Sequence, residues 1–452
     1  MFKILRGVLA ASLVAVTFSG LFAQTVSSVI GGISTTPTRP TPAGVVWNPA
    51  LIGALSNTQI ETNLSLLGGW LIYDRQGTDP NTGKPYKSSS MNSLAPNPYF
   101  SISSPLGTEK FRFAFTSYFP SGAMARFDDE GSQRYEFIRG YMLPWHNQLT
   151  IAYRPNPTWT FAVAGISSTA FFQTELDVDL SHFMEGVLHS SEIPKESSAL
   201  ASRAQIPQSW TQGWGGAIGI LYWPTYEWSM GLSFFSPIVY NFEGDLNLQS
   251  PSMVSVLGSG LRALGVEEVV PNRIKARSVM PAFLQLGTRF QPFGYWTNEY
   301  FGRYTFSSWN RSLSIRVQNS QIAALHGFEI PGKALNDTFL MGTVQTFSFW
   351  QRWNLGTNIN YYLNGTDDQV LSLSRADFDS LMTGVFLHYS WNKKLTLGAE
   401  YAHTFMFDRS SQDAEISQNN STNQNQYFRL SVSDAHYRAS LDRVGLNLKY
   451  AF

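Results

Sequence analysis

Apolar and polar residues alternate with a two-residue period along much of the chain. The sequence ends in RVGLNLKYAF, where every second residue from Val444 to Phe452 is apolar and the residues between them are polar or small. The stretches 111–115, 149–153 and 395–407 repeat this alternation. A two-residue period indicates β-strands with one apolar and one polar face.

The lengths of the segments and their connections separate two kinds of β protein. Many alternating segments run for about ten residues, with aromatic residues near their ends, which is typical of membrane barrels rather than soluble sandwiches. Short turns also alternate with long polar connections, as in outer-membrane barrels. We therefore predict an all-β fold, a transmembrane antiparallel β-barrel of about 14 strands that runs from near Ile60 to Phe452. The predicted short turns are 105–109, 154–159, 223–228, 290–296, 350–353 and 391–395.

The N-terminus predicts export. Lys3 and Arg6 precede the apolar stretch Val8–Phe18, and small residues follow around Ala23. This order is typical of a secretory signal peptide, here residues 1–23. The alternative is an uncleaved anchor helix, but the apolar run is shorter than the roughly 20 residues that span a bilayer. An exported chain of long alternating strands is expected in the bacterial outer membrane, as a multi-pass barrel over residues 59–452.

The amino-acid composition argues against several classes of function. Lys and Arg together number 32, as do Asp and Glu, so no basic surface for a nucleic acid is expected. There is no cysteine, which excludes disulfides and thiolate metal sites. The seven histidines show no paired metal-ligand spacing. We expect no cofactor, no metal and no enzymatic activity. His403 lies on the lipid-facing side of the alternation, and no serine motif of the kind that a barrel hydrolase would need accompanies it.

The segment before the first strand is unusual. Residues 24–55 are rich in small residues, Ser, Thr and Pro, and show no alternation. One interpretation is a disordered leader. The other is a plug, or hatch, over residues 24–58 that fills the barrel lumen. The sequence WNPALI, with Asn48-Pro49-Ala50 directly before the first strand, favours the hatch.

This tripeptide resembles the hatch signature of the FadL/TodX family of outer-membrane transporters. Further stretches resemble family motifs in the same order: 115–137, 149–165, 214–246, 304–315 and the closing LKYAF. The stretch STTPTRPTPAG, before Asn48, departs from the Gly/Ala-rich sequence of the family. The resemblance implies a passive channel for hydrophobic compounds such as long-chain fatty acids or aromatic hydrocarbons. The partners it implies are a hydrophobic small molecule, outer-membrane lipid and the barrel-assembly machinery, which would recognise Phe452, with the protein itself a monomer.

Two external connections are predicted to form amphipathic helices that capture the substrate. Their apolar residues recur at helical spacing, and Pro251 stands where the second helix would begin. The alternative is that these faces only pack on each other and on the barrel rim. The predicted ligand-binding residues are Leu180, Phe183, Met184 and Val187 in the first connection, and Met253, Leu257 and Leu261 in the second.

The remaining candidate ligand residues lie in the hatch and in one strand. Asn48, Pro49 and Ala50 correspond to the hatch portion that adjoins the internal pocket in the family, or they form a turn that starts strand one. The alternation in SSWNRSLSIRVQ predicts that Arg316 faces the lumen, where it either binds a fatty carboxylate or pairs with an acid on another strand. The alternative function is that of a porin or an adhesin-like barrel.

Pro120 is predicted to interrupt a strand, because proline has no backbone N–H to donate to the ladder.

Overall fold

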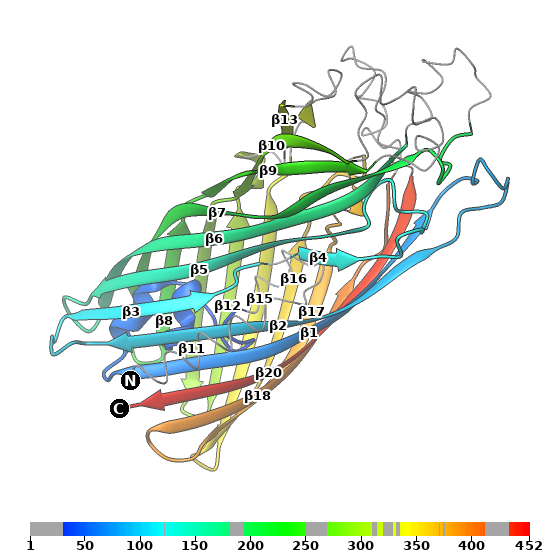
Figure 1. Ribbon diagram of the computed structural model, residues 1–452. Helices are drawn as coiled ribbons and strands as arrows, with labels where there is room; N and C mark the ends of the chain where they lie inside the picture. Colours follow the sequence, from blue (N-terminus) through cyan, green and yellow to red (C-terminus); the bar gives the residue numbers. More distant parts are fainter. Residues whose placement is uncertain are drawn as a thin grey trace.

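The computed structural model describes residues 30–121, 123–179, 194–249, 269–309, 314–319, 329–330, 335–369, 371–373, 376–411 and 434–452. These residues form a closed antiparallel barrel of 14 strands (Figure 1). The barrel closes because β20 pairs with β1 from Gln59–Ala451 to Arg75–Ala435. Among the described residues, no helix is both long and apolar enough to cross a bilayer.

At two of the fourteen wall positions a long strand is interrupted for two residues, at Ser236–Pro237 and at Pro281–Ala282. The wall strands, in chain order, are β1 (Gln59–Arg75), β2 (Ser89–Ser104), β3 (Phe111–Tyr118), β5 (Arg139–Tyr153), β6 (Trp159–Asp179), β7 (Ala201–Tyr222), β8 (Trp228–Phe235) with β9 (Ile238–Gln249), β10 (Val269–Met280) with β11 (Phe283–Phe293), β12 (Trp296–Thr305), β15 (Thr338–Phe349), β16 (Trp353–Leu363), β17 (Ser380–Ser390), β18 (Leu395–Met406) and β20 (Ala435–Ala451).

Shorter elements extend the wall strands, connect them or lie inside the barrel. They are the strands β4 (Ala123–Arg126), β13 (Ser314–Asn319), β14 (Glu329–Ile330) and β19 (Arg409–Ser410), and the 3-10 helices η3 (Pro42–Val46), η4 (Pro49–Ala54) and η5 (Ser307–Trp309). The helices η3 and η4, blue in Figure 1, lie inside the barrel near the end at which β20 terminates.

The register confirms the predicted turns. All six predicted short turns join wall strands at one end of the barrel, the end at which β1 begins and β20 finishes. The backbone N–H of Phe452 there donates to the carbonyl of Thr58 at 2.9 Å. The long connections lie at the opposite end. This asymmetry assigns the short-turn end to the periplasm and the long-connection end to the outside.

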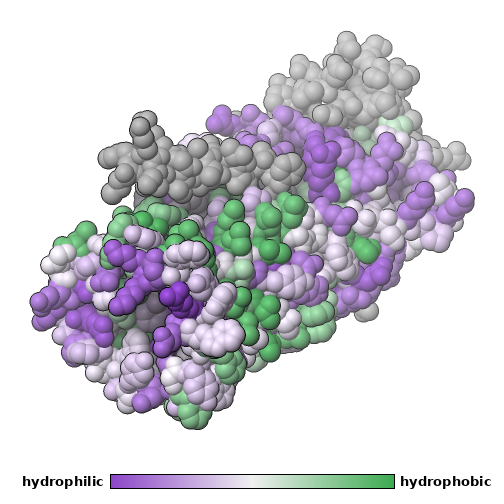
Figure 2. Space-filling model, turned by 90° about the horizontal axis from the view of Figure 1, so that it is seen from below, coloured by the Kyte–Doolittle hydropathy of each residue, from purple (hydrophilic) through white to green (hydrophobic). Residues whose placement is uncertain are grey.

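The alternation also sorts the two faces as predicted. On β20, Val444 and Leu446 are 55% and 64% exposed, whereas Arg443 and Asn447 are buried. Figure 2 shows the outward hydrophobic residues as a band between more hydrophilic ends. A bilayer removes such apolar side chains from water, so the exposed band is the surface that contacts lipid.

Candidate functional site

The lumen at the periplasmic end is filled by residues 30–55, here called the luminal segment. Its central side chains, Trp47, Ala50, Leu51 and Ile52, have no exposed surface. They belong to one apolar cluster with inward residues of strands from all around the barrel. The described part of the segment that was predicted as a hatch is therefore packed against the wall, and residues 24–29 lie outside the described residues.

Local sequence explains how the luminal segment turns. Each of its two 3-10 helices begins with a proline that follows a capping residue, Thr41 before Pro42 and Asn48 before Pro49. A polar cap satisfies a free backbone N–H, and proline at the first helical position has no N–H to satisfy. The Asn48 side chain accepts from the N–H of Ala50 at 3.0 Å.

The Asn-Pro-Ala tripeptide also ties the luminal segment to the wall. The Asn48 amide donates to the carbonyl of Ile220 on β7 at 2.9 Å. The backbone of β7 lies so close to this side chain that a Cβ atom added at Gly219 would be 2.2 Å from Oδ1 of Asn48. Both predicted roles thus remain compatible with the geometry: the tripeptide is a turn before β1, and it lies at the interface between segment and wall.

Two buried glutamates of the wall hold the backbone of the luminal segment. Glu400 on β18 accepts from the N–H of Ile33 at 2.9 Å and forms an ion pair with Arg443 at 2.8 Å. Glu61 on β1 accepts from the N–H of Ala43 at 2.9 Å. Hydrogen bonds to a charged acceptor are stronger than neutral ones, so these contacts fix the segment at two points of the wall.

A third glutamate binds side chains of the luminal segment. Glu299 on β12 has no exposed side-chain surface and pairs with Arg39, whose Nε lies 2.9 Å away. Glu299 also accepts from the hydroxyls of Thr36 at 2.8 Å and Thr38 at 3.2 Å. Four donors from three residues of the segment therefore converge on this single carboxylate, counting both guanidinium nitrogens of Arg39.

Trp47 anchors the segment through aromatic contacts. Its ring meets Phe301 of β12 edge to face, with centroids 5.1 Å apart, and the guanidinium of Arg303 lies 4.4 Å above it. The carbonyl of Trp47 accepts from Ser233 at 2.5 Å and Gln285 at 2.7 Å. The indole ring and its own backbone are thus both held by the wall.

The wall itself is interrupted between β2 and β4, as predicted for Pro120. β3 ends at Tyr118 and β4 begins at Ala123. β2 pairs with β3 only from Tyr99 to Ser104, although its pairing with β1 continues to Ser89. Prolines have no N–H to donate to a ladder. This stretch, here called the wall gap, is flanked by Pro96 and Pro98 of β2 and by Pro120.

At the outer end, the connection between β16 and β17 folds inward. Leu371 and Leu373 have no exposed surface, and Phe378 is also buried. They share an apolar cluster with inward residues of β1, β2, β18 and β20. The N–H of Leu373 donates to a carboxylate oxygen of Glu136 in the connection before β5. The described residues of 364–379, here called the mouth loop, therefore cover part of the outer mouth.

A partly buried carboxyl group lies in the mouth loop. Asp377 accepts from the N–H of Gly365 at 3.1 Å and from the Tyr362 hydroxyl at 3.2 Å. Burial raises the pKa of the Asp377 carboxyl to about 6. Arg409 crosses the base of the loop and donates to the carbonyls of Asp377 at 2.8 Å and Thr366 at 2.6 Å.

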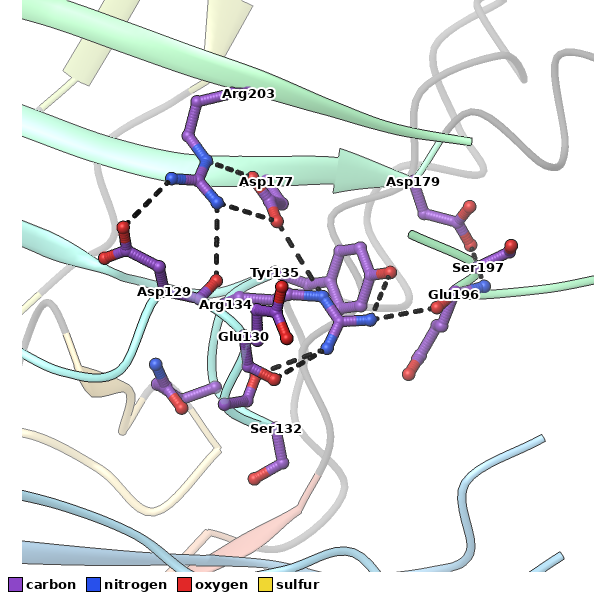
Figure 3. Close-up of polar contacts among 12 residues, drawn as sticks. Asp129, Glu130, Ser132, Arg134, Tyr135, Asp177, Asp179, Glu196, Ser197 and Arg203 are labelled. Carbon is purple, nitrogen blue, oxygen red and sulfur yellow. Dashed lines mark hydrogen bonds and ion pairs between the residues drawn. The ribbon is translucent and has the colours of Figure 1, made fainter. Parts of the chain in front are cut away.

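Ion pairs join three connections at the outer rim (Figure 3). Arg134 lies 3.7 Å from Asp177 at the end of β6 and donates to the carbonyl of Glu196 at 3.0 Å. Glu196 in turn pairs with Arg75 of β1 at 2.6 Å. Arg203 of β7 binds the same Asp177. Because the pairs share partners, the described parts of these connections form one network rather than separate mobile loops.

The structure corrects the prediction for Arg316. Its side chain is exposed, and in the register it lies opposite Lys275 of β10. Residues directly opposite each other share a face of the sheet. Lys275 pairs with Glu243 at 3.0 Å with both side chains about half exposed, whereas Ile274 beside it is buried. Arg316 therefore lies on the exposed face that it shares with Lys275 and does not face the lumen, because β13 pairs with β10 in this register.

The predicted capture helices cannot be compared with the structure. Leu180, Phe183, Met184, Val187, Met253, Leu257 and Leu261 lie outside the described residues. β6 continues through Asp179, the last described residue before the first of these connections. The glutamates that hold the luminal segment were missed, although each occupies a polar-face position within an alternating strand, which is the signal that could have found them.

A closed barrel with an apolar exterior and an occupied lumen defines a class, that of outer-membrane barrel proteins. A family model for outer membrane protein transport proteins (OMPP1/FadL/TodX) matches residues 27–452. The chain belongs to this family, which is one of transport proteins and not of enzymes, and its place is the bacterial outer membrane.

Solved structures share the fold at low sequence identity. A FadL homologue of Pseudomonas aeruginosa is 14% identical with a TM-score of 0.76, over 96% of this chain and 99% of that one. The toluene transporter TodX of P. putida is 14% identical with a TM-score of 0.67 and the same coverage. The Ralstonia pickettii toluene transporter TbuX is 13% identical with a TM-score of 0.63, again with that coverage. No curated protein sequence matches the chain.

Proposed function

We propose that this protein is a passive channel that carries small hydrophobic compounds across the outer membrane. The observation that carries the proposal is the filled lumen beside an interrupted wall. The luminal segment occupies the direct route to the periplasm, whereas the wall gap lies beside it. A hydrophobic compound gains nothing from a water-filled pore and is stabilised by apolar contacts along its route.

The chemical class of the cargo is proposed from the apolar residues of the lumen and from the descriptions of the solved relatives. Two of those relatives are described as toluene transporters and one as a FadL homologue. Apolar clusters line the lumen on both sides of the barrel above the luminal segment. We infer that aromatic hydrocarbons and long-chain fatty acids are the candidate cargo, that the luminal segment acts as the hatch, and that the protein works as a monomer in contact with outer-membrane lipid.

Deleting residues 30–55 tests the role of the hatch. The intact protein is expected to show almost no ion conductance in planar bilayers, because the luminal segment fills the lumen. The deletion variant is expected to conduct steadily, since the polar inner wall would then surround water. A large conductance of the intact protein would contradict the proposal and favour a porin or an adhesin-like barrel.

Closing the wall gap tests the exit route. In a variant with Pro98→Val and Pro120→Val, both positions gain a backbone N–H and a side chain with high β propensity. We expect β2 to pair with β4, and uptake of a labelled hydrocarbon into cells to fall several-fold. Pro105→Val, in a short turn at the other end, is the control. Uptake equal to that of the parent would show that cargo does not leave through the wall gap.

A further inference from the structure

His146 occupies the inner edge of the wall gap. It lies on the inward face of β5, is buried, and is the register partner of Tyr118, the last residue of β3. Its Nδ1 lies 3.4 Å from the Tyr118 hydroxyl, and its Nε2 lies 3.4 Å from the hydroxyl of Tyr240 on β9. The Tyr118 ring also meets the imidazole edge to face, with centroids 5.3 Å apart.

The partners of the two tyrosines fix the direction of the hydrogen bonds. The Tyr118 hydroxyl donates to the amide oxygen of Gln148 at 3.1 Å, since an amide oxygen can only accept. Its oxygen is then free to accept from Nδ1–H of His146. The Nε2 atom therefore accepts, and the Tyr240 hydroxyl is its donor. Tyr240 in turn accepts from the hydroxyl of Ser168, 2.7 Å away.

This arrangement leaves the imidazole weakly bonded. Both of its contacts, at 3.4 Å, are longer than the usual 2.7–3.2 Å of a hydrogen bond to nitrogen. Among the described residues, His146 forms no ion pair; its two partners are hydroxyl groups, which in turn bond to an amide and a hydroxyl group. A neutral ring that offers one donor and one acceptor matches a group that can itself accept and donate.

A hydroxyl group is the simplest guest with this property. It can accept from Nδ1–H or donate to Nε2, and it can replace either long contact by one of normal length. A carboxylate only accepts, so it can replace the contact made by Nδ1–H but not the contact at Nε2, which needs a donor. A hydrocarbon forms no hydrogen bond and leaves the cluster as it is.

We propose that His146, together with Tyr118 and Tyr240, binds the hydroxyl group of a neutral hydrophobic cargo, such as a phenol or a fatty alcohol, beside the wall gap. The proposal rests on the proposed transport of hydrophobic compounds and specifies their chemical class. The same hydrogen-bonded chain reaches the hatch, because the Gln148 amide donates to the carbonyl of Val45 at 3.5 Å.

A matched pair of ligands tests this subsite. Purified full-length protein in detergent is titrated with naphthalene and with 1-naphthol, and binding is followed by fluorescence. We expect His146→Phe to weaken 1-naphthol binding about three- to tenfold, the effect of losing one or two hydrogen bonds, while naphthalene affinity is kept. His146→Gln, which retains a donor and an acceptor, should bind 1-naphthol more nearly as the parent does.

Controls separate the possible failures. His403→Phe makes the same change on the outward face, where His403 contacts Asp442 at 2.8 Å, and should alter neither affinity. If His146→Phe loses the heat-resistant gel mobility of a folded barrel, Tyr240→Phe provides the test, because it removes one hydroxyl and keeps the ring. Equal changes for both ligands, or no change, would overturn the subsite. Failure of the parent protein to bind either ligand would instead refute the proposed transport of hydrophobic compounds.

Discussion

Glu299→Gln is expected to release the hatch from the wall and to make the barrel conduct ions. The substitution keeps the size of the side chain but removes the charge that balances Arg39. Breaking a buried ion pair by removing one partner costs roughly 3–5 kcal/mol, because the other charge remains buried without compensation. The exposed fraction of the Arg39 side chain is 17%, so the lower end of this range is expected.

Single-channel recordings measure this release as brief openings that the parent protein lacks. Glu243→Gln is the matched control, since Glu243 pairs with Lys275 on an exposed face, where an ion pair is worth little. The double variant with Arg39→Gln should conduct less than Glu299→Gln alone, because it leaves no unpaired charge. Equal, silent traces for Glu299→Gln and the parent would show that this carboxylate does not hold the hatch.

The second large effect is a pH dependence of the mouth loop. Burial raises the pKa of Asp377 to about 6, above the ordinary value of a carboxyl, so the closed loop favours the protonated form. Its contribution to loop stability is therefore full below about pH 4 and is lost as the pH rises through about 6. The difference corresponds to roughly 2–3 kcal/mol. Arg409 and Asp379 lie close to this group, and Arg409 opposes the shift.

Hydrogen exchange of residues 371–373 and 376–379 at several pH values measures the opening of the mouth loop. Protection beyond the intrinsic pH dependence of exchange should fall between about pH 4 and pH 7 in the parent. Asp377→Asn, which stays neutral, should remain protected throughout this range, and Asp367→Asn, at an exposed position, should behave as the parent does. Protection that is independent of pH in the parent would contradict a titrating Asp377.

The sequence by itself determined the barrel and its orientation. A two-residue period is a property of neighbouring residues, so the lipid-facing side of Val444 and Leu446 could be inferred without knowing any strand partner. The same holds for the short turns and for the interruption at Pro120, since proline acts on its own backbone. The resemblance at Asn48-Pro49-Ala50 led to the family, which a model match over residues 27–452 confirms.

The tertiary structure alone decided which residues meet inside the lumen. Ile33 and Glu400 are 367 residues apart in the chain, and they meet only because closure of the barrel brings β18 beside the luminal segment. His146 and Tyr240 meet because pairing through β6 and β7 places β5 and β9 near each other in the curved wall. The prediction for Arg316 was wrong because alternation shows which residues of a strand share a face but not which of the two faces turns inward; pairing with β10 places Arg316 opposite the exposed Lys275. Periodicity sorts the residues of a strand into two faces, whereas register and closure determine which face turns inward and what it contacts.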